Sequence, residues 1–333
     1  MTKAFRALAI TTLRNEGAFL LEWLAHHRAV GFTDVLVYSN DCEDGTDAML
    51  DRLQEMGLLT HVPNPGPWDE GPQWAVLKAA DRHKALRRAD WAMVLDIDEF
   101  VNIHAGDRTL AALFQAAPDV DVFPMTWRMF GNAGVIAYED RPVTQTFTRA
   151  APRNLHWPWR ALMVKTLFRA DGSFGRLGVH RPRNPAPDRT PRWFDPTLGN
   201  RLFSEPGRDP YGLMQLNHYA LGAMESYIVK CDRGRANREG AAFDMSYWCD
   251  RNFCDDEDAS VARLDSTAGR AQLLADPVLA DLHAQAVAWR KARFATLMAQ
   301  EPWRALFGRL LMTPPARGLS ASDAELIRKY RAS

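Results

Sequence analysis

The sequence predicts an α/β fold in which helices cover both faces of a sheet, followed by a helical C-terminal appendage. In the first third of the chain, short apolar runs alternate with segments of helical periodicity, which is typical of successive βαβ units and a parallel sheet. After residue 254 the chain becomes rich in Ala, Leu and Arg at helical spacing and loses the strand signals. We therefore expect an α/β domain over residues 1–254 and a helical region over 255–333.

The individual elements follow from apolar runs and from helical spacing. Between residues 16 and 31, Phe19, Leu20, Trp23 and Leu24 recur at the spacing of one helix face, and a glycine ends the segment. Applying the same criteria along the chain, we expect strands at 7–13, 34–39, 58–62 and 91–96 and helices at 16–31, 46–57 and 72–89.

The composition excludes several classes of protein. The 333 residues include 41 basic and 41 acidic side chains, and no long run of one sign provides the basic surface of a nucleic-acid-binding protein. No stretch approaches the roughly 20 apolar residues that a membrane-spanning helix needs. The N-terminal residues are typical of a first strand rather than of a cleavable signal. We therefore expect a cytoplasmic protein without a nucleic-acid partner.

Three acids follow the fourth expected strand directly, in the sequence "DIDEF". Ligands of open parallel α/β sheets bind at the carboxyl ends of the strands, where these acids lie. An extended backbone would place Asp96 and Asp98 on one side and Ile97 on the other, so both carboxylates can approach one Mg²⁺ or Mn²⁺ ion that carries a phosphorylated ligand. Glu99 either supports these ligands from behind or pairs with a nearby cation.

An ordered set of motifs carries a resemblance to a known family. The segments "RNEGAFLLEWLAHHRAVGF", "VYSNDCEDGT", "DWAMVLDIDEF" and "LNHYALGAMESYIVKCDRGR" resemble bacterial proteins grouped with glycosyltransferase family 2, in the branch with a DxDEF motif. The resemblance implies a GT-A (Rossmann-like) fold, with a donor half over about 1–105 and an acceptor half over about 106–254. It also implies an inverting transfer, in surface polysaccharide synthesis, from a nucleotide-diphospho-sugar, by preference UDP-linked, with a metal held by the DxD motif.

Ten polar residues are candidates for binding the donor. They are Arg14, Asn15, Glu16, Asn40, Asp41, Asp44, Lys78, Lys230, Arg233 and Arg235. The resemblance puts the "RNE" residues against the nucleotide and Asp41 or Asp44 against its uracil or ribose. Each group has a structural alternative, because Asn and Asp favour turns and basic helix faces are commonly solvated.

A histidine is expected to complete the metal shell. By resemblance to GT-A enzymes, His218 in "QLNHYA" and His180 in "GRLGVHRPR" are the two candidates. His218 directly precedes the basic helix that is expected to hold the diphosphate, so it is the first choice. A histidine that is only hydrogen-bonded within the protein is the alternative for both.

The acceptor is expected to bind between residues 121 and 215, where aromatic residues are frequent. The candidates are Trp127, Phe130, Gly131, Trp157, Trp159 and Trp193. An inverting enzyme needs a carboxylate base to take the proton of the acceptor hydroxyl, and Asp140 and Asp195 both remain open for that role. The acceptor is expected to be a glycan or a lipid-linked molecule, and the aromatic and basic segment 288–311 either contacts a membrane surface or packs on the protein.

Two other functions compete with glycosyl transfer. A non-catalytic protein that binds nucleotide-sugars or glycans would carry the same polar residues at the same sheet edge. A phosphatase with a DxD nucleophile is less consistent, because its motif normally follows the first strand, whereas three expected strands precede the one that "DIDEF" follows here. Metal-dependent release of a nucleoside diphosphate distinguishes the enzyme from the binder.

Overall fold

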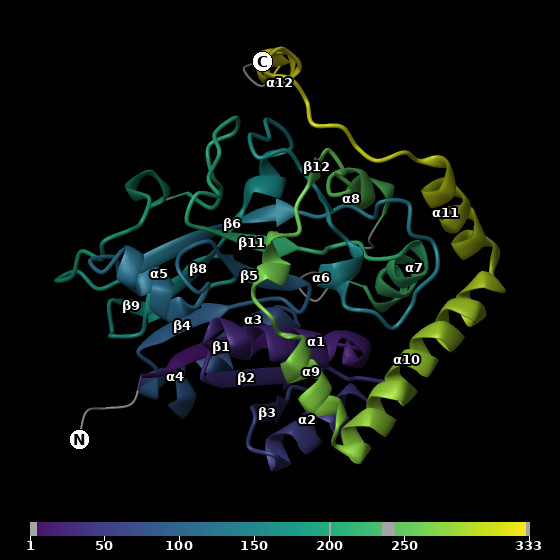
Figure 1. Cartoon of the computed structure of the whole chain (residues 1–333), viewed down its shortest axis with the longest axis horizontal. Helices are drawn as coiled ribbons and strands as arrows, with labels where there is room; N and C mark the ends of the chain where they lie inside the picture. The colour runs from purple at the N-terminus through teal and green to yellow at the C-terminus, as the bar shows by residue number, and fades with distance from the viewer. Residues whose placement is uncertain (1–4, 200, 235–243, 331–333) are drawn as a thin grey trace.

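The computed structural model describes residues 5–199, 201–234 and 244–330 and is built around one eight-stranded sheet (Figure 1). The strand order is β3-β2-β1-β4-β8-β6-β11-β5. These strands are β1 Ala7–Leu13, β2 Asp34–Ser39, β3 Thr60–Pro63, β4 Trp91–Val94, β5 Glu99–Ile103, β6 Val122–Met129, β8 Val164–Arg169 and β11 Met214–His218. Two small sheets pair β7 Arg149–Ala150 with β12 Asp256–Glu257, and β9 Phe174–Arg176 with β10 Arg183–Pro185.

Helices connect these strands and form most of the C-terminal region. The α-helices up to residue 249 are α1 Gly17–Val30, α2 Thr46–Glu55, α3 Pro72–Ala80, α4 Lys84–Arg88, α5 Leu110–Ala116, α6 Val143–Thr146, α7 Met224–Arg233 and α8 Met245–Cys249. Those that follow are α9 Thr267–Leu274, α10 Pro277–Met298, α11 Glu301–Met312 and α12 Ala321–Lys329. Three short 3₁₀ helices are η1 Trp159–Leu162, η2 Pro196–Leu198 and η3 Ser260–Arg263.

The sheet is mixed, which corrects the expectation of a parallel sheet. Strands β1 to β4 are parallel to one another, but β8 runs antiparallel between β4 and β6, and β5 runs antiparallel to β11. The reason is the connection after β4: a short turn, too short to hold a crossover helix, leads to β5 at the edge of the sheet. Only the first four strands therefore follow the βαβ rule.

Helices cover both faces of the sheet, as predicted. Alternate residues of β1 face opposite sides: Ala9 lies in the core beneath α1 and α2, whereas Leu8 lies in the core beneath α3. Leu24 of α1 belongs to the first core and Leu77 of α3 to the second. The α/β class of the prediction is therefore confirmed.

The expected helix over 72–89 is two helices in the structure. Residues 81–83 form a turn, and His83 starts α4 by accepting a hydrogen bond from the backbone N–H of Ala85 at 3.2 Å. The expected strand over 91–96 also ends early, at Val94. Both differences arise where local hydrogen bonds end an element that the apolar pattern would continue.

The C-terminal helices are present as predicted, and α10 runs along the edge of the molecule beside α1, α2 and α7 (Figure 1). In the segment 288–311, Trp289, Phe294, Trp303 and Phe307 pack against the core that α7 and α8 form. These aromatic side chains therefore pack on the protein. Within the described residues, no helix is both long enough and apolar enough to cross a membrane.

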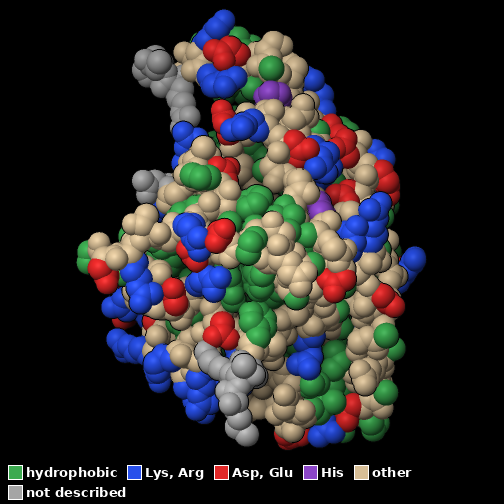
Figure 2. All heavy atoms as spheres, turned by 60° about the vertical axis from the view of Figure 1, so that its left-hand side comes forward, with side chains coloured by type: hydrophobic (Ala, Val, Ile, Leu, Met, Phe, Trp, Pro, Cys, Tyr) green, Lys and Arg blue, Asp and Glu red, His purple; other side chains and the backbone are tan. Residues whose placement is uncertain are grey.

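Charges of both signs share the molecular surface. Figure 2 shows basic and acidic side chains interspersed over one face, around a central group of hydrophobic side chains. The formal net charge of the whole chain is zero, with 41 residues of each sign. On this face, the mixture of signs offers a phosphate backbone no continuous basic stripe.

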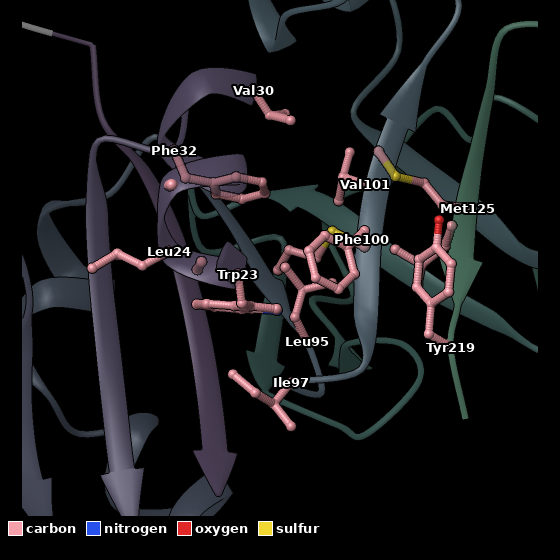
Figure 3. Close-up of a cluster of buried hydrophobic side chains, with 14 of the residues drawn as sticks. Trp23, Leu24, Val30, Phe32, Leu95, Ile97, Phe100, Val101, Met125 and Tyr219 are labelled. Carbon is pink, nitrogen blue, oxygen red and sulfur yellow. The ribbon is translucent and has the colours of Figure 1, made fainter. Parts of the chain in front are cut away.

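A buried tryptophan fixes the turn that carries the acids. The indole N–H of Trp23, on α1, donates to the backbone carbonyls of Asp96 at 3.2 Å and Glu99 at 3.1 Å. Ile97, between the two acids of the DxD motif, packs into the same core beside Trp23 and Leu95 (Figure 3). Helix α1 therefore holds the turn after β4 from beneath.

We predict that Trp23→Phe lowers the free energy of unfolding by about 1 kcal/mol beyond the cost of the lost ring volume, because the carbonyl of Glu99 loses a buried donor. The carbonyl of Asp96 still accepts from the backbone N–H of Glu99 at 3.1 Å. Urea unfolding measures the change. Trp91→Phe is the matched control, because Trp91 is equally buried and stacks on Phe114 at 4.4 Å. Equal losses in the two variants would contradict a special role for the indole N–H.

Candidate functional site

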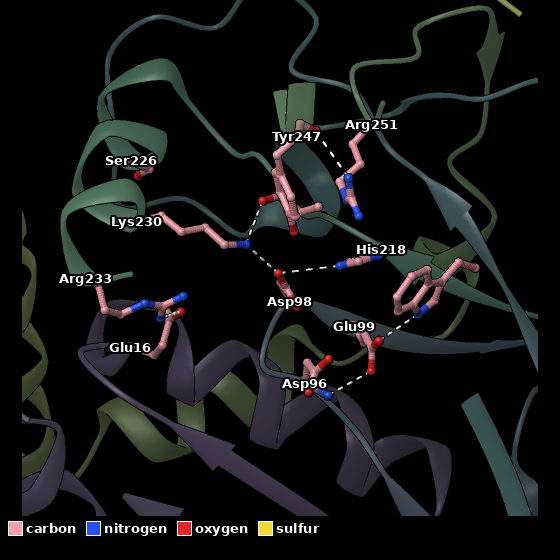
Figure 4. A network of polar contacts seen from close by, with 12 residues as sticks. Glu16, Asp96, Asp98, Glu99, His218, Ser226, Lys230, Arg233, Tyr247 and Arg251 are labelled. Carbon is pink, nitrogen blue, oxygen red and sulfur yellow. Dashed lines mark hydrogen bonds and ion pairs between the residues drawn. The ribbon is translucent and has the colours of Figure 1, made fainter. Parts of the chain in front are cut away.

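The three acids of "DIDEF" meet side chains from four other elements. Asp96 and Asp98 lie in the turn between β4 and β5, and Glu99 begins β5 (Figure 4). The chain turns at Ile97 and Asp98, so the extended backbone that would place both aspartates on one side does not continue to Asp98. That part of the sequence argument is wrong, and each aspartate has a lysine of its own instead.

Asp98 lies between a lysine and a histidine. Its carboxylate accepts a hydrogen bond from the ammonium of Lys230 on α7 at 2.7 Å, and Nε2 of His218 at the end of β11 lies 3.6 Å away. Burial alone would raise the pKa of Asp98, but the neighbouring Lys230 and His218 hold this pKa well below its ordinary value. Asp98 is therefore a carboxylate at neutral pH.

Asp96 and Glu99 share a lysine that the sequence analysis did not select. The ammonium of Lys165, on β8, lies 3.0 Å from Asp96 and 3.5 Å from Glu99, and its side chain is fully buried. Burial opposes the charge of Lys165, but the two carboxylates raise its pKa above the ordinary value. The one available signal was a lysine inside the apolar strand "MVKTLF", since an isolated buried ammonium is costly.

Both carboxylate oxygens of Glu99 accept hydrogen bonds from groups of the protein itself. One oxygen accepts from the indole N–H of Trp127 at 2.6 Å, and the other accepts from the backbone N–H of Asp96 at 2.8 Å. Burial raises the pKa of Glu99 well above its ordinary value, and Lys165 and the backbone N–H of Asp96 oppose this rise only in part. With both oxygens engaged and the side chain fully buried, Glu99 positions the turn.

Glu16 connects the start of α1 to two arginines. Arg233, at the end of α7, pairs with one carboxylate oxygen, and Arg290 of α10 lies 3.4 Å from the other. Arg233 also donates to the backbone carbonyl of Arg14, and Arg290 donates to that of Asn15. The "RNE" segment therefore joins the basic end of α7, and the C-terminal region contributes a buried arginine that the sequence analysis missed.

The remaining donor candidates fall into two groups. Asn40 and Asp44 are buried and bonded within the fold: Asn40 donates to the carbonyl of Leu13, and Asp44 accepts from the backbone N–H groups of Gly17 and Thr46. The other group is exposed. Asp41 accepts a weak hydrogen bond from Gly66, and Lys78 pairs with Glu70. Arg235 lies outside the described residues.

Asp96, Asp98 and His218, the three ligands expected from the sequence, all have the chemistry of metal ligands, and that role remains a prediction. Among the described residues, no group of three or more His, Cys, Asp or Glu side chains is placed to hold a metal ion. Asp98 and His218 nevertheless form an adjacent oxygen and nitrogen pair, and burial lowers the pKa of His218, so its imidazole is neutral. Burial also lowers the pKa of His180, to about 4, and its Nδ1 lies 3.0 Å from the carbonyl of Val164.

The aromatic acceptor candidates are dispersed. Trp127 and Phe130 are buried, and a side chain at Gly131 would collide with the carbonyl of Phe253. Trp159 packs on Phe203 at 5.0 Å, Trp193 meets Phe174 edge-on at 6.5 Å, and Trp157 is 37% exposed. Trp157, Trp159 and Trp193 therefore do not take part in the contacts with Lys230 and His218 that surround Asp98.

The two base candidates make contacts of their own. Asp140 pairs with His283 at 3.1 Å and with Arg270 at 3.0 Å, and the hydrogen bond from His283 lowers its pKa. Asp195 accepts from the backbone N–H of Thr197 and begins a 3₁₀ helix. Both contacts are structural, and the choice of base remains a prediction.

Comparisons with known proteins identify a family. The sequence profile of glycosyltransferase family 92 matches residues 8–195, which is more than half of the chain. A family 92 protein of Ricinus communis is 31% identical over 98 residues, covering 29% of this chain and 17% of that protein. One of Oryza sativa subsp. japonica is 26% identical over 152 residues, covering 44% of this chain and 25% of that protein. This chain thus spans about a quarter or less of the length of these relatives.

Solved structures give only weak similarity. S. aureus TarS, residues 1–349 in complex with UDP, is 14% identical, with 50% of this chain and 47% of that chain covered and a TM-score of 0.32. A CMP:2-keto-3-deoxy-manno-octonic acid synthetase with CTP is 13% identical, with 50% and 75% covered and a TM-score of 0.25. These scores are too low to carry an argument about the site.

We predict that the cost of removing Lys230 depends on pH. Lys230→Met should lower the free energy of unfolding by about 3 kcal/mol near pH 7, because it leaves the buried charge of Asp98 without its partner. In the wild type the pKa of Asp98 lies well below its ordinary value of 3.8, so Asp98 stays ionised at every pH above 3.8. The ion pair therefore contributes its full stabilisation at both pH values that are compared. In the variant, burial raises that pKa, so the carboxyl takes up a proton as the pH falls and the penalty shrinks.

Urea unfolding near pH 7 and near pH 4.5 measures this dependence. Lys78→Met is the control, because Lys78 belongs to an exposed pair and its removal should cost less than about 1 kcal/mol at both values. An equal loss for Lys230→Met at the two pH values would contradict the assignment of a buried, charge-compensated Asp98.

Proposed function

Because the chain belongs to glycosyltransferase family 92, we propose that it transfers a sugar from a nucleotide-diphospho-sugar to an acceptor hydroxyl. The family agrees with the expected enzyme class, whereas the narrower assignment to the DxDEF branch of family 2 is not confirmed by this match. The observation that carries the proposal is the position of Asp98 between His218 and Lys230, in the turn that follows a strand of the parallel half-sheet.

The cations around the turn suit a diphosphate leaving group. Breaking the bond between the sugar and its phosphate leaves a nucleoside diphosphate, whose negative charge must be stabilised as the bond breaks. Lys230 and Arg233 lie three residues apart on α7, and both remain charged because Asp98 and Glu16 raise their pKa values. We propose that these two side chains compensate the diphosphate, and we keep UDP as the preferred nucleotide from the family 2 resemblance.

We propose that Asp98 and His218 would hold a Mn²⁺ or Mg²⁺ ion. Their oxygen and neutral nitrogen suit such an ion, which commonly takes its other ligands from water and from phosphate oxygens. When bound, the ion would supply a positive charge beside the leaving diphosphate. Lys165 and Glu99 fix Asp96 and the turn from behind, so the ligand atoms of Asp98 are held in place before the donor binds.

The transfer exchanges one bond at the anomeric carbon. The acceptor oxygen forms a bond to this carbon while the bond to the phosphate oxygen breaks, and that electron pair leaves with the nucleoside diphosphate. The proton of the acceptor hydroxyl passes to a carboxylate base, for which Asp140 and Asp195 remain the sequence-based candidates. We propose a direct displacement, which inverts the anomeric configuration.

The setting of the reaction is also a proposal. We propose a glycan or lipid-linked acceptor in surface polysaccharide synthesis, and a cytoplasmic protein that contacts the inner face of the cell membrane. The aromatic residues of the segment 288–311 are occupied by packing, but Leu311 and Met312 at the end of α11 are 49% and 77% exposed. A membrane contact would therefore use the end of this helix.

We predict that Asp98→Asn reduces sugar-nucleotide turnover per folded molecule roughly 100-fold or more, because it removes a charged ligand without changing the shape of the side chain. The variant should still fold but melt at a lower temperature, since Lys230 loses its charged partner. Turnover and melting temperature are measured together. Asp90→Asn is the control: Asp90 accepts a hydrogen bond from the backbone N–H of Arg6 at 2.8 Å, and asparagine keeps an acceptor there.

Three results, two with the Asp98→Asn variant and one with the wild type, would contradict the proposal. Full activity of Asp98→Asn would contradict metal-assisted transfer, and loss of activity only through unfolding would make the acid structural. Tight UDP binding by the wild type, without turnover of any nucleotide-sugar, would indicate the non-catalytic binder.

We predict that UDP binds at least about tenfold more tightly with Mn²⁺ than with EDTA, because the ion would neutralise charge on both the protein and the diphosphate. His218→Ala should reduce this difference more than His180→Ala, since His218 adjoins Asp98 and the ring of His180 is bonded to a backbone carbonyl. Calorimetry measures both. Equal affinity with Mn²⁺ and EDTA would contradict the metal, and the reverse ranking of the two variants would reassign its histidine ligand.

A further inference from the structure

A cavity lies next to the proposed catalytic turn and is not explained by donor binding. It has a volume of about 340 Å³ and lies between the segment 135–147 and the start of α7. A smaller hollow of about 50 Å³ adjoins it and is lined by Asp98 and Lys230. The two hollows share the lining residues Phe19, Val143, Gly222 and Ser226. The two hollows therefore adjoin each other, and their lining residues extend from Ile136, which is 45% exposed, to Asp98.

The walls of the larger cavity are apolar. Ile136 lies 45% exposed at the rim, whereas Tyr138 and Phe147 are buried deeper in the wall. The ring of Phe19 meets that of Tyr138 edge-on at 5.9 Å. The charged lining residues, Glu139 and Arg141, are both strongly exposed and pair with each other at 3.7 Å. A ligand that fills this cavity therefore contacts mainly hydrocarbon and aromatic surface.

A buried hydroxyl marks the boundary between the two hollows. Ser226 is 5% exposed, and its hydroxyl oxygen has no hydrogen-bond partner among the residues that the structure describes. Ser226 and Lys230 are four residues apart on α7, so they share one helix face, and the ammonium of Lys230 reaches Asp98 (Figure 4). An unsatisfied buried hydroxyl is costly unless a ligand or water pairs with it. The oxygen itself has almost no accessible surface, so a polar group of a ligand would pair with it after the side chain rotates toward the hollows that Ser226 lines.

We infer that this cavity binds the acceptor and that the acceptor is amphiphilic: an apolar group fills the space below Ile136, and a hydroxyl passes Ser226 toward Asp98. This inference rests on the proposed glycosyl transfer and names the class of its acceptor. A free oligosaccharide fits less well, because its buried hydroxyls would face walls with few hydrogen-bonding groups. The cavity lies apart from Trp157, Trp159 and Trp193, which are not among its lining residues.

Alkyl β-glucosides with one, four and eight carbons test the inference on the full chain with UDP and Mn²⁺ present. Each methylene that enters the cavity should tighten binding about threefold to fourfold, so the octyl compound should bind at least about tenfold more tightly than the methyl compound. Calorimetry below the concentration at which octyl glucoside forms micelles measures the series. A flat series would overturn the inference.

A charge placed at the rim tests whether this cavity is the site of binding. Ile136→Asp should reduce the affinity for octyl glucoside at least about tenfold, because the carboxylate would lie beside the alkyl chain of the ligand. The exposed position should tolerate the substitution without loss of stability. Val278→Asp is the control, since Val278 is 47% exposed on α10. Equal octyl affinity in the two variants would overturn the inference.

The same measurements separate the inference from the proposed function. Binding of UDP together with equal affinity for methyl and octyl glucoside would overturn the amphiphilic acceptor and leave glycosyl transfer standing. The opposite result is also possible: the protein binds no nucleotide and turns over no nucleotide-sugar, but its affinity for alkyl glucosides rises with chain length and falls in Ile136→Asp. That result would support the apolar site and contradict the proposed enzyme.

Discussion

The ion pair between Asp98 and Lys230 is the interaction on which the site depends. Asp98 belongs to a turn that α1 holds from beneath through Trp23, and Lys230 belongs to a helix more than a hundred residues later in the chain. Their charges are nearly buried, so removing either one would leave the other uncompensated in a poorly solvated place. This pairing fixes α7 against the end of β4 and so brings Ser226, Arg233 and the two hollows beside the acid.

Much of the fold was predictable from local pattern. The expected strands at 7–13 and 34–39 have the observed bounds, because continuous apolar runs bounded by turn residues leave few alternatives. The end of the fourth strand was predicted less well. The alternation argument assumed extended backbone through Asp98, but the chain turns at Ile97 and Asp98, and the two aspartates pair with different lysines.

The site residues that were missed depend on contacts far apart in the sequence. Lys165 is 69 residues from Asp96, and Arg290 is 274 residues from Glu16, so no local pattern joins either pair. The sequence does contain one indication of the role of Lys165, because a charged residue stands inside an apolar strand. Arg290 had no such indication, because its segment is rich in arginine, lysine and aromatic residues and resembles a surface helix. Asp98 was predictable because it closely follows an apolar strand, and Lys230 because it lies on a basic helix face. His218 was selected from the family resemblance and from its place just before that helix.

The charge balance of the assembled site bears on how a diphosphate would bind. Four acids pair with four cations, and burial keeps the imidazole of His218 neutral. These acids and cations are Asp96, Asp98, Glu99, Glu16, Lys165, Lys230, Arg233 and Arg290. Burial raises the pKa of Glu99 well above its ordinary value, so without a ligand this set carries at most a small net positive charge, and a diphosphate that enters would add negative charge beside Asp98. Binding is then favoured if Lys230 or Arg233 exchanges its acid for a phosphate oxygen or if positive charge enters as well. The divalent ion that we propose Asp98 and His218 would hold would meet the second condition without breaking the pair that holds α7.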